Sequence, residues 1–341
     1  MTGIRALADS LNISIGTVSR ALNGKPGVNP ETRDRVLKMA QETGYVANAA
    51  GRNLRKGLTN TIGMVIGTGP AAAKGDNNFF MAVTDAMQRA MLERGVDLIL
   101  LPCHAAMDPL AFLQRTLQRG SIDGLVLTAT LEQDPRIAML EASHLPFITL
   151  GRSRTPGNYA WMDLDFEGAA RQSVARLAEL GHRRIAIGIP KGQANLSALY
   201  LESWRQQMQA EGLSPSDDLL FVDDFTEAGG AQVAARLLDQ ADRPTAILMC
   251  SEPMISGFCG GLLGAGVQPG ADVSVIGFRQ SPLLRHLAPP ISCFDMDLDA
   301  LGEDMAKAIL GLVYDADNAL HITRAISPMT YVETASVQPL R

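Results

Sequence analysis

Near its amino terminus the chain reads ISIGTVSRALNG, residues 13–24. The preceding segment, 3–11, has its apolar residues on one helical face, and a tight turn follows it. Ser14 then predicts the start of a second helix over 15–22, because its side chain can accept a hydrogen bond from the free N–H groups of the first turn. Two short helices joined by such a turn are typical of a helix-turn-helix, whose second helix enters the major groove of DNA.

The rest of this amino-terminal region supports a separate small module. Asn29-Pro30 predicts the start of a third helix that ends near Thr43, and residues 48–56 predict a short fourth helix. Residues 1–58 contain nine Lys or Arg and four Asp or Glu, a net charge of +5, whereas the remainder has 21 basic and 32 acidic residues, a net charge of −11. A basic head on an acidic body indicates a module that binds a polyanion.

The amino-terminal part of the second helix would face the bases. We expect DNA contacts from Ile15, Gly16, Thr17, Ser19, Arg20 and Asn23. Arg20 can donate two hydrogen bonds to one guanine, and Ile15 can contact a thymine methyl group. The hydroxyl and amide side chains suit phosphate contacts, which position the protein without reading sequence. The alternative interpretation is a small structural helical cap that carries a surface arginine.

From Thr61 onward the pattern changes to short apolar strands that alternate with amphipathic helices, which is typical of an α/β protein with parallel sheets. About ten such units exceed one sheet of roughly 4–6 strands, so we expect two lobes. The predicted strands are 62–66, 97–101, 124–127, 147–150, 185–189, 220–222, 246–250 and 273–277.

Several motifs, in order along nearly the whole chain, resemble one family. They are the stretch at 13–24, VNPETR at 28–33, IDGLV at 122–126, GHRRI at 181–185 and DVSVIGF at 272–278. Together they are similar to the lactose-repressor/galactose-repressor family of bacterial transcription regulators. The resemblance implies an all-α helix-turn-helix head with a hinge helix, and a two-lobed body like a type I periplasmic binding protein.

The resemblance also implies domain boundaries and a second DNA contact. The lobes would be joined by three crossovers, near Asp163, Ser292 and Thr323. Leu54 occupies the hinge-helix position at which the family inserts a leucine between the two central base pairs, a wedge that bends the duplex. The implied parts are a helix-turn-helix domain at 1–47, a hinge helix and linker at 48–60, and an effector-binding body at 61–338, with an N-lobe of about 62–162 and 293–323 and a C-lobe of about 163–292 and 324–338.

Ligands of such folds bind where the strands end at their carboxyl termini. The resemblance places Asn78, Phe80, Asp163, Tyr200, Phe225 and Arg279 at this effector site. Arg152 follows the predicted strand 147–150 and could reach the same site, with a solvated loop as the alternative. We expect Phe80 in the pocket and Phe79 in the core or a dimer contact.

Two of these positions depart from the family pattern. Tyr200 stands where members typically carry Arg, and Arg279 stands where they typically carry Asp. Aromatic rings suit a sugar face, so a sugar or sugar derivative stays the expected effector. Arginine is shaped for carboxylate or phosphate, so an anionic metabolite is the alternative. A further alternative is that Arg279 pairs with a protein acid, for which Asp223, Asp224 or Glu252 are the candidates.

The remaining function classes lack sequence support. The sequence has no nucleotide-binding glycine loop, no Gly-x-Ser-x-Gly elbow and no His/Cys metal spacing, so we expect no enzyme activity, cofactor or metal. No run approaches the roughly 18 apolar residues of a membrane span, and no signal peptide is evident, so we expect a cytoplasmic protein. The sequence predicts a homodimeric repressor on a near-palindromic DNA operator. Control by a partner protein, or a solute-binding role, are the alternatives.

Overall fold

The computed structural model describes residues 3–22, 24–43, 45, 58–68, 77–315 and 322–340. The chain divides into two compact units, Met1–Thr59 and Asn60–Arg341, which we call the head and the body. Within the described residues no helix is long and apolar enough to cross a membrane.

The head has the three helices that the sequence predicts, α1 (Ile4–Leu11), α2 (Ile15–Leu22) and α3 (Pro30–Glu42). Both predicted caps are confirmed: the Thr17 N–H donates to Ser14 Oγ at 3.1 Å, and the Asn29 side chain accepts from the Glu31 N–H. The fourth predicted helix, 48–56, lies outside the described residues. The three helices enclose one small apolar core, made of Leu7, Ala8, Leu11, Val18, Ala21, Val36 and Ala40.

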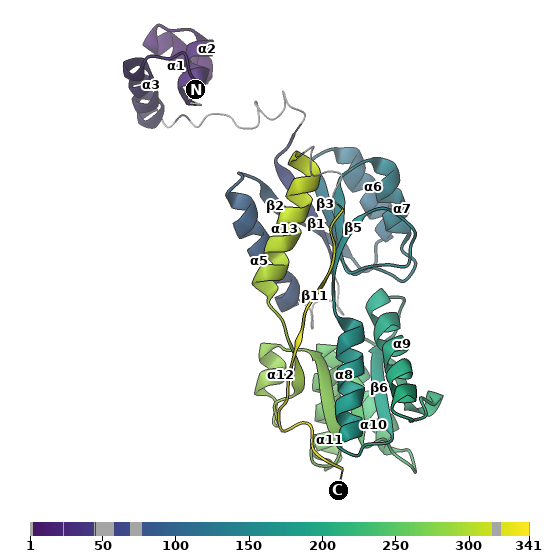
Figure 1. The fold of residues 1–341 in the computed structure, drawn as a ribbon. Helices are drawn as coiled ribbons and strands as arrows, with labels where there is room; N and C mark the ends of the chain where they lie inside the picture. Colours follow the sequence, from purple (N-terminus) through teal and green to yellow (C-terminus); the bar gives the residue numbers. More distant parts are fainter. Residues whose placement is uncertain are drawn as a thin grey trace. The chain divides into compact units, whose positions relative to one another are not determined.

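The first sheet of the body has the strand order β11-β5-β4-β3-β1-β2, and its neighbours are all parallel. Its strands are β1 (Thr61–Thr68), β2 (Asp97–His104), β3 (Gly124–Leu127), β4 (Phe147–Leu150), β5 (Ala160–Leu164) and β11 (Arg324–Ser327). Helices α5 (Asn77–Leu92) and α13 (Leu298–Tyr314) pack on one face of it, and α6 (Pro109–Arg119) and α7 (Pro135–Ser143) on the other (Figure 1). Both faces are therefore buried, which explains the continuous apolar strands of the sequence.

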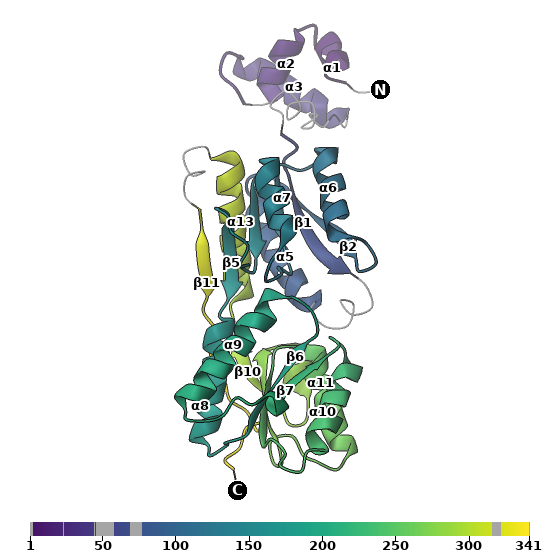
Figure 2. The same cartoon turned by 90° about the vertical axis from the view of Figure 1, so that its right-hand side faces the viewer.

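The second sheet repeats this order as β12-β10-β9-β8-β6-β7. Its strands are β6 (Ile185–Pro190), β7 (Leu220–Asp223), β8 (Ala246–Met249), β9 (Ser274–Arg279), β10 (Ser292–Asp295) and β12 (Thr330–Val332). Helices α8 (Phe166–Glu179) and α9 (Asn195–Ala210) cover one face, and α10 (Glu227–Leu238) and α11 (Glu252–Gly264) cover the other (Figure 2). The short helix α12 (Pro282–His286) packs with α11 (Figure 1). Only the last strand differs, because β12 runs antiparallel to β10.

The chain passes between the sheets three times, and two of the predicted crossovers are wrong by a few residues. The first passage, between β5 and α8, lies where the sequence places it. The second follows β10, because β10 pairs with β9 and belongs wholly to the second sheet. The third follows β11, because β11 pairs with β5 in the first sheet. Of the described residues, the first lobe contains 60–68, 77–164, 298–314 and 324–327, and the second contains 166–295 and 330–340.

Candidate functional site

A cavity of about 350 Å³ lies in the body, at the carboxyl ends of strands from both sheets. This is the position at which open α/β sheets bind ligands, and the volume is that of a small-molecule site. Its lining is Gly67, Phe79, Phe80, Ala129, Thr130, Leu150, Gly151, Arg152, Asp163, Leu164, Phe166, Leu196, Phe225, Cys250, Phe278 and Arg279. Of the predicted effector residues, Phe80, Arg152, Asp163, Phe225 and Arg279 are brought together here, and their role in binding stays a prediction.

An ion-pair cluster at the cavity joins Arg152 and Asp163 of the first lobe to Glu167 of the second. Arg152 Nε donates to Asp163 Oδ2 at 2.9 Å, and the same guanidinium contacts the Glu167 carboxylate at the start of α8. Burial raises the pKa of Asp163 to about 6, against the opposing effects of Arg152 and of the Leu164 N–H that the carboxylate accepts. Arg152 thus faces two carboxylates, so its charge is matched within the protein.

The second lobe contributes an aromatic wall. The Phe166 and Phe278 rings stack with centroids 4.3 Å apart and planes 12° apart. Tyr200 does not line the cavity, which corrects the prediction for this residue. It is fully buried and meets Phe278 edge-on from behind, at 5.9 Å between centroids. The reason is the rotation of α9 against its sheet, which turns the helix face shared by Tyr200 and Trp204 into the core.

The two adjacent phenylalanines at the start of α5 both line the cavity, although the sequence predicts only Phe80 there. Phe79 is buried against the core and also presents its ring to the Arg279 guanidinium, which lies 4.6 Å from the ring centroid. A cation over an aromatic face is an attractive contact, and here it joins the two lobes across the cavity. Asn78 is exposed and outside the lining, so the structure does not support it as an effector contact.

Two of the three acids proposed as partners of Arg279, namely Asp223 and Asp224, have other ion pairs, and Glu252 stays a candidate. Asp223 contacts Arg236 at 3.0 Å and Lys191 at 3.7 Å, and Asp224 contacts Lys191 at 3.2 Å. Phe166 and Phe278 were missed from the sequence. The signal for Phe278 was available, because Phe278 follows the predicted strand 273–277, at the end where this fold collects its ligand contacts. Phe166 follows β5, a strand that the sequence did not predict, so the sequence analysis offered no such signal for it.

In the head, α2 exposes the face that the helix-turn-helix would present to DNA. Ile15, Gly16 and Arg20 are exposed and Thr17 and Ser19 are half-buried, whereas the opposite face, Val18 and Ala21, is buried. The Thr17 hydroxyl lies 2.9 Å from Ser14 Oγ, so it also takes part in the helix cap. Asn23 and Leu54 lie outside the described residues. No group of metal-ligating side chains was found in the part of the chain that the structure describes.

A helical head of this kind, followed by a two-lobed α/β body with a cavity between its sheets, defines the class of DNA-binding transcription regulators with a ligand-binding domain. Residues 4–48 match the model of bacterial regulatory proteins of the lacI family, and residues 174–337 match that of the periplasmic binding protein-like domain. The HTH-type transcriptional regulator AglR of Rhizobium meliloti (strain 1021) is 32% identical over 313 residues, which cover 90% of this chain and 87% of AglR. The chain belongs to the lacI family.

Other relatives agree with this assignment. The HTH-type transcriptional regulator CelR of Thermobifida fusca is 28% identical over 309 residues, 90% of either chain. A solved complex of a transcriptional regulator CelR with cellobiose superimposes with a TM-score of 0.72 at 24% identity, over 98% of this chain and all of that one. A lac repressor dimer bound to operator and the anti-inducer ONPF gives a TM-score of 0.86 at 20% identity, over 99% of each chain. These structures share the fold of this chain.

Proposed function

We propose that this regulator is a cytoplasmic repressor that binds its operator as a homodimer, and that a sugar or sugar derivative in the cavity switches its operator affinity. The observation that supports this proposal best is the composition of the cavity, whose lining includes both the buried carboxylate of Asp163 and the ring of Phe278. A carboxylate suits hydroxyl groups and an aromatic ring suits the apolar face of a pyranose. The solved relative with cellobiose, and the relatives of known regulatory function, support the same choice.

A thermal-shift panel tests the effector class, because a ligand that binds the native state raises its melting temperature by mass action. The panel sets neutral mono- and disaccharides against uronic acids and sugar phosphates. We expect a neutral sugar to raise the melting temperature of the wild type and to weaken operator binding over the same concentration range. Asp163→Asn should lose both responses, whereas Arg20→Ala should lose operator binding and keep the thermal shift.

The second candidate is an anionic effector, which is favoured by the presence of the Arg279 guanidinium at the cavity. Arg152 adds little to this alternative, because its charge already faces Asp163 and Glu167. Calorimetry with Arg279→Ala separates the two candidates. A shift produced only by acidic sugars, and lost in this variant, would replace the neutral-sugar proposal. Unchanged affinity in the variant would assign Arg279 a structural role.

Selection of binding sites from random DNA tests the operator proposal. A dimer with twofold symmetry should select two half-sites in a near-palindromic arrangement. Arg20→Ala should cost about 1–3 kcal/mol per half-site and relax the preference at one guanine. Leu54→Ala should reduce DNA bending and blur discrimination at the central step. A monomer on DNA would refute the homodimer proposal. A DNA bend that Leu54→Ala leaves unchanged would refute the role of Leu54 as a wedge.

A further inference from the structure

A short segment of the second lobe pairs with the first lobe beside the cavity. Residues 193–195, which lead into α9, lie antiparallel to the loop after β3. The Asn195 N–H donates to the Thr130 carbonyl at 3.0 Å, and the Glu132 N–H donates to the Gln193 carbonyl at 2.9 Å. We call residues 193–195 the docking segment. Its backbone hydrogen bonds therefore join the two lobes, each of which is built on its own sheet.

The side chain of Asn195 adds a contact that reaches the cavity wall. Its Nδ2 donates to the Arg152 carbonyl at 2.7 Å, and the same carbonyl accepts from Thr130 Oγ1 at 2.9 Å. The opposite amide orientation would set two oxygens against each other, so the contact fixes which atom is the donor. Asn195 is only 2% exposed, so water cannot readily replace this bond.

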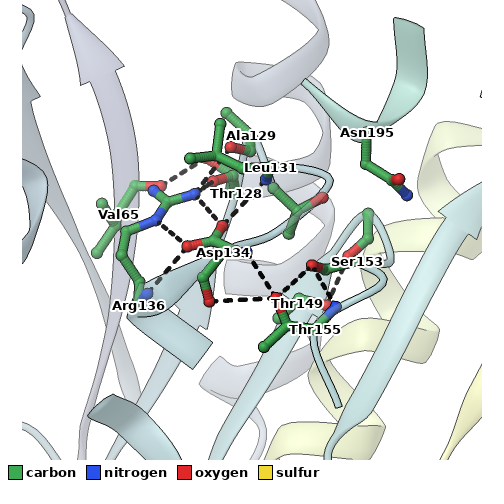
Figure 3. Close-up of polar contacts among 12 residues, drawn as sticks. Val65, Thr128, Ala129, Leu131, Asp134, Arg136, Thr149, Ser153, Thr155 and Asn195 are labelled. Atoms are coloured by element: carbon green, nitrogen blue, oxygen red, sulfur yellow. Dashed lines mark hydrogen bonds and ion pairs between the residues drawn. The ribbon is translucent and has the colours of Figure 1, made fainter. Parts of the chain in front are cut away.

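The loop that receives the docking segment is held by its own polar network (Figure 3). Asp134 Oδ2 accepts from the Leu131 N–H at 3.0 Å, and Arg136 donates to the Ala129 carbonyl at 2.8 Å and pairs with Asp134 at 2.6 Å. Figure 3 places Asn195 beside the neighbouring loop, which carries Ser153. These bonds lie within the first lobe, so the receiving surface is built without the second lobe.

We propose that Asn195 is a positioning residue for the effector site: by docking from the second lobe it fixes the backbone of Arg152, so the cavity wall is complete only when the docking segment is paired. The guanidinium of Arg152 contacts Asp163 and Glu167 at the cavity. A hydrogen bond donated by the second lobe therefore positions a charged side chain that belongs to the first lobe. This role rests on the proposed effector function of the cavity, but the pairing itself exists in the chain without any effector.

Amide hydrogen exchange on the full-length protein tests the docking, and it requires no effector. The reporting amides are those of Glu132 and Asn195, which bond across the lobes. In Asn195→Ala we expect their protection factors to fall by about tenfold, the effect of losing one buried hydrogen bond. The control is Gln206→Glu, an exposed position on the same helix, which should retain wild-type protection.

The isosteric variant Asn195→Asp separates positioning from space filling. An ionised carboxylate cannot donate to the Arg152 carbonyl, whereas a protonated one can. Burial raises the pKa of such a group, so protection should be low at about pH 8 and recover toward wild type at about pH 5. Wild type measured at each pH is the reference, since several charged groups flank the site, namely Glu132, Asp134, Arg136, Arg152, Arg154, Asp163, Glu167 and Glu202.

A second readout follows the charged group itself. If Asn195 fixes Arg152, then Asn195→Ala should raise the pKa of Asp163 above its value of about 6, measured by carbon NMR with Asp163→Asn for assignment. Wild-type protection in both Asn195 variants, or an unchanged pKa of Asp163, would overturn the proposal. Uniform loss of protection across both lobes would also overturn it, because it would show a general structural role. A failed search for an effector would affect the proposed function alone.

Discussion

The two lobes have the same strand order, yet they fasten their outer helices by different means. In the first lobe, α6 and α7 contain no glycine, and the loop before α7 is fixed by the buried pair of Asp134 and Arg136. In the second lobe, α10 and α11 approach until backbone meets backbone. A Cβ on Gly257 would lie 1.8 Å from the Glu227 carbonyl oxygen, and one on Gly230 would lie 1.9 Å from that of Met254.

The comparison teaches that one sheet topology can hold its outer helices in two ways, and that each way is sensitive to a different kind of substitution. A buried ion pair depends on both partners, because either charge alone in the interior is costly. Close helix packing depends on the absence of a side chain. The cavity shows a similar division, with an acid from the first lobe and stacked rings from the second.

The largest effect should come from the ion pair of the first lobe. Arg136→Ala leaves the fully buried Asp134 carboxylate without its cation, and we expect a loss of about 3–5 kcal/mol in the free energy of unfolding. Chemical denaturation measures the loss, and Arg171→Ala, an exposed arginine on α8, is the control. A loss below about 1 kcal/mol would mean that the network is dispensable, as for a surface pair.

The close packing of the second lobe should give the next effect. Gly257→Ala forces backbone to move, and we expect a loss of about 3 kcal/mol, at the upper end for overpacking. Gly260→Ala on the same helix meets nothing within 4 Å and should instead stabilise by about 0.5–1 kcal/mol. Equal effects of the two substitutions would show that the helix contact is not tight.

Asp163→Asn sharpens the comparison at the cavity, where it should stabilise the protein and weaken effector binding. The pKa of this acid is about 6 in the fold and 3.8 ordinarily, so the native state binds the proton more tightly. The contribution of Asp163 to the free energy of unfolding is therefore most favourable below about pH 4, and it is lost as the pH rises through 6. At pH 7 the variant should gain up to about 3 kcal/mol. Denaturation across this range should show a flatter pH dependence; an unchanged slope would contradict the assignment.

The smallest effect should come from an exposed bridge between the lobes. Arg154 pairs with Glu202 of the second lobe at 2.6 Å and with Glu132 at 3.2 Å, and all three side chains are about half exposed. Solvent screens such contacts, so Arg154→Ala should cost less than about 1 kcal/mol, and added salt should reduce the difference from wild type. A larger, salt-insensitive loss would place this arginine among the groups that hold the lobes together.

The sequence predicts the helical head and eight of the strands because their signals are local. A cap such as Ser14, or an apolar run such as 124–127, depends on a few neighbouring residues. The missed strands are β5, β10, β11 and β12. The edge strands β11 and β12 are short and largely exposed or half-buried, so they lack the apolar pattern, and only pairing with distant strands defines them.

The cavity was partly predictable for a related reason. Position after the predicted strand 147–150 identified Arg152, because the fold gathers such residues at one edge, and the family resemblance identified Asp163. It could not show that α9 turns Tyr200 into the core, nor that Phe79 faces both core and cavity. Those outcomes depend on the rotation of helices against their sheets, which spacing along one helix does not determine.

The position of β11 also has a consequence for the order in which the parts of the protein can fold during synthesis. The first lobe begins at residue 60, but its edge strand comes from 324–327 and its helix α13 from 298–314, near the end of the chain. The apolar core of the head is made only of residues within the first 45 of the chain. During synthesis on the ribosome the head can therefore fold early, whereas the first lobe cannot be completed until nearly the whole chain has been made. A chain that stops before residue 324 would carry the head on a body whose first sheet lacks its edge strand β11.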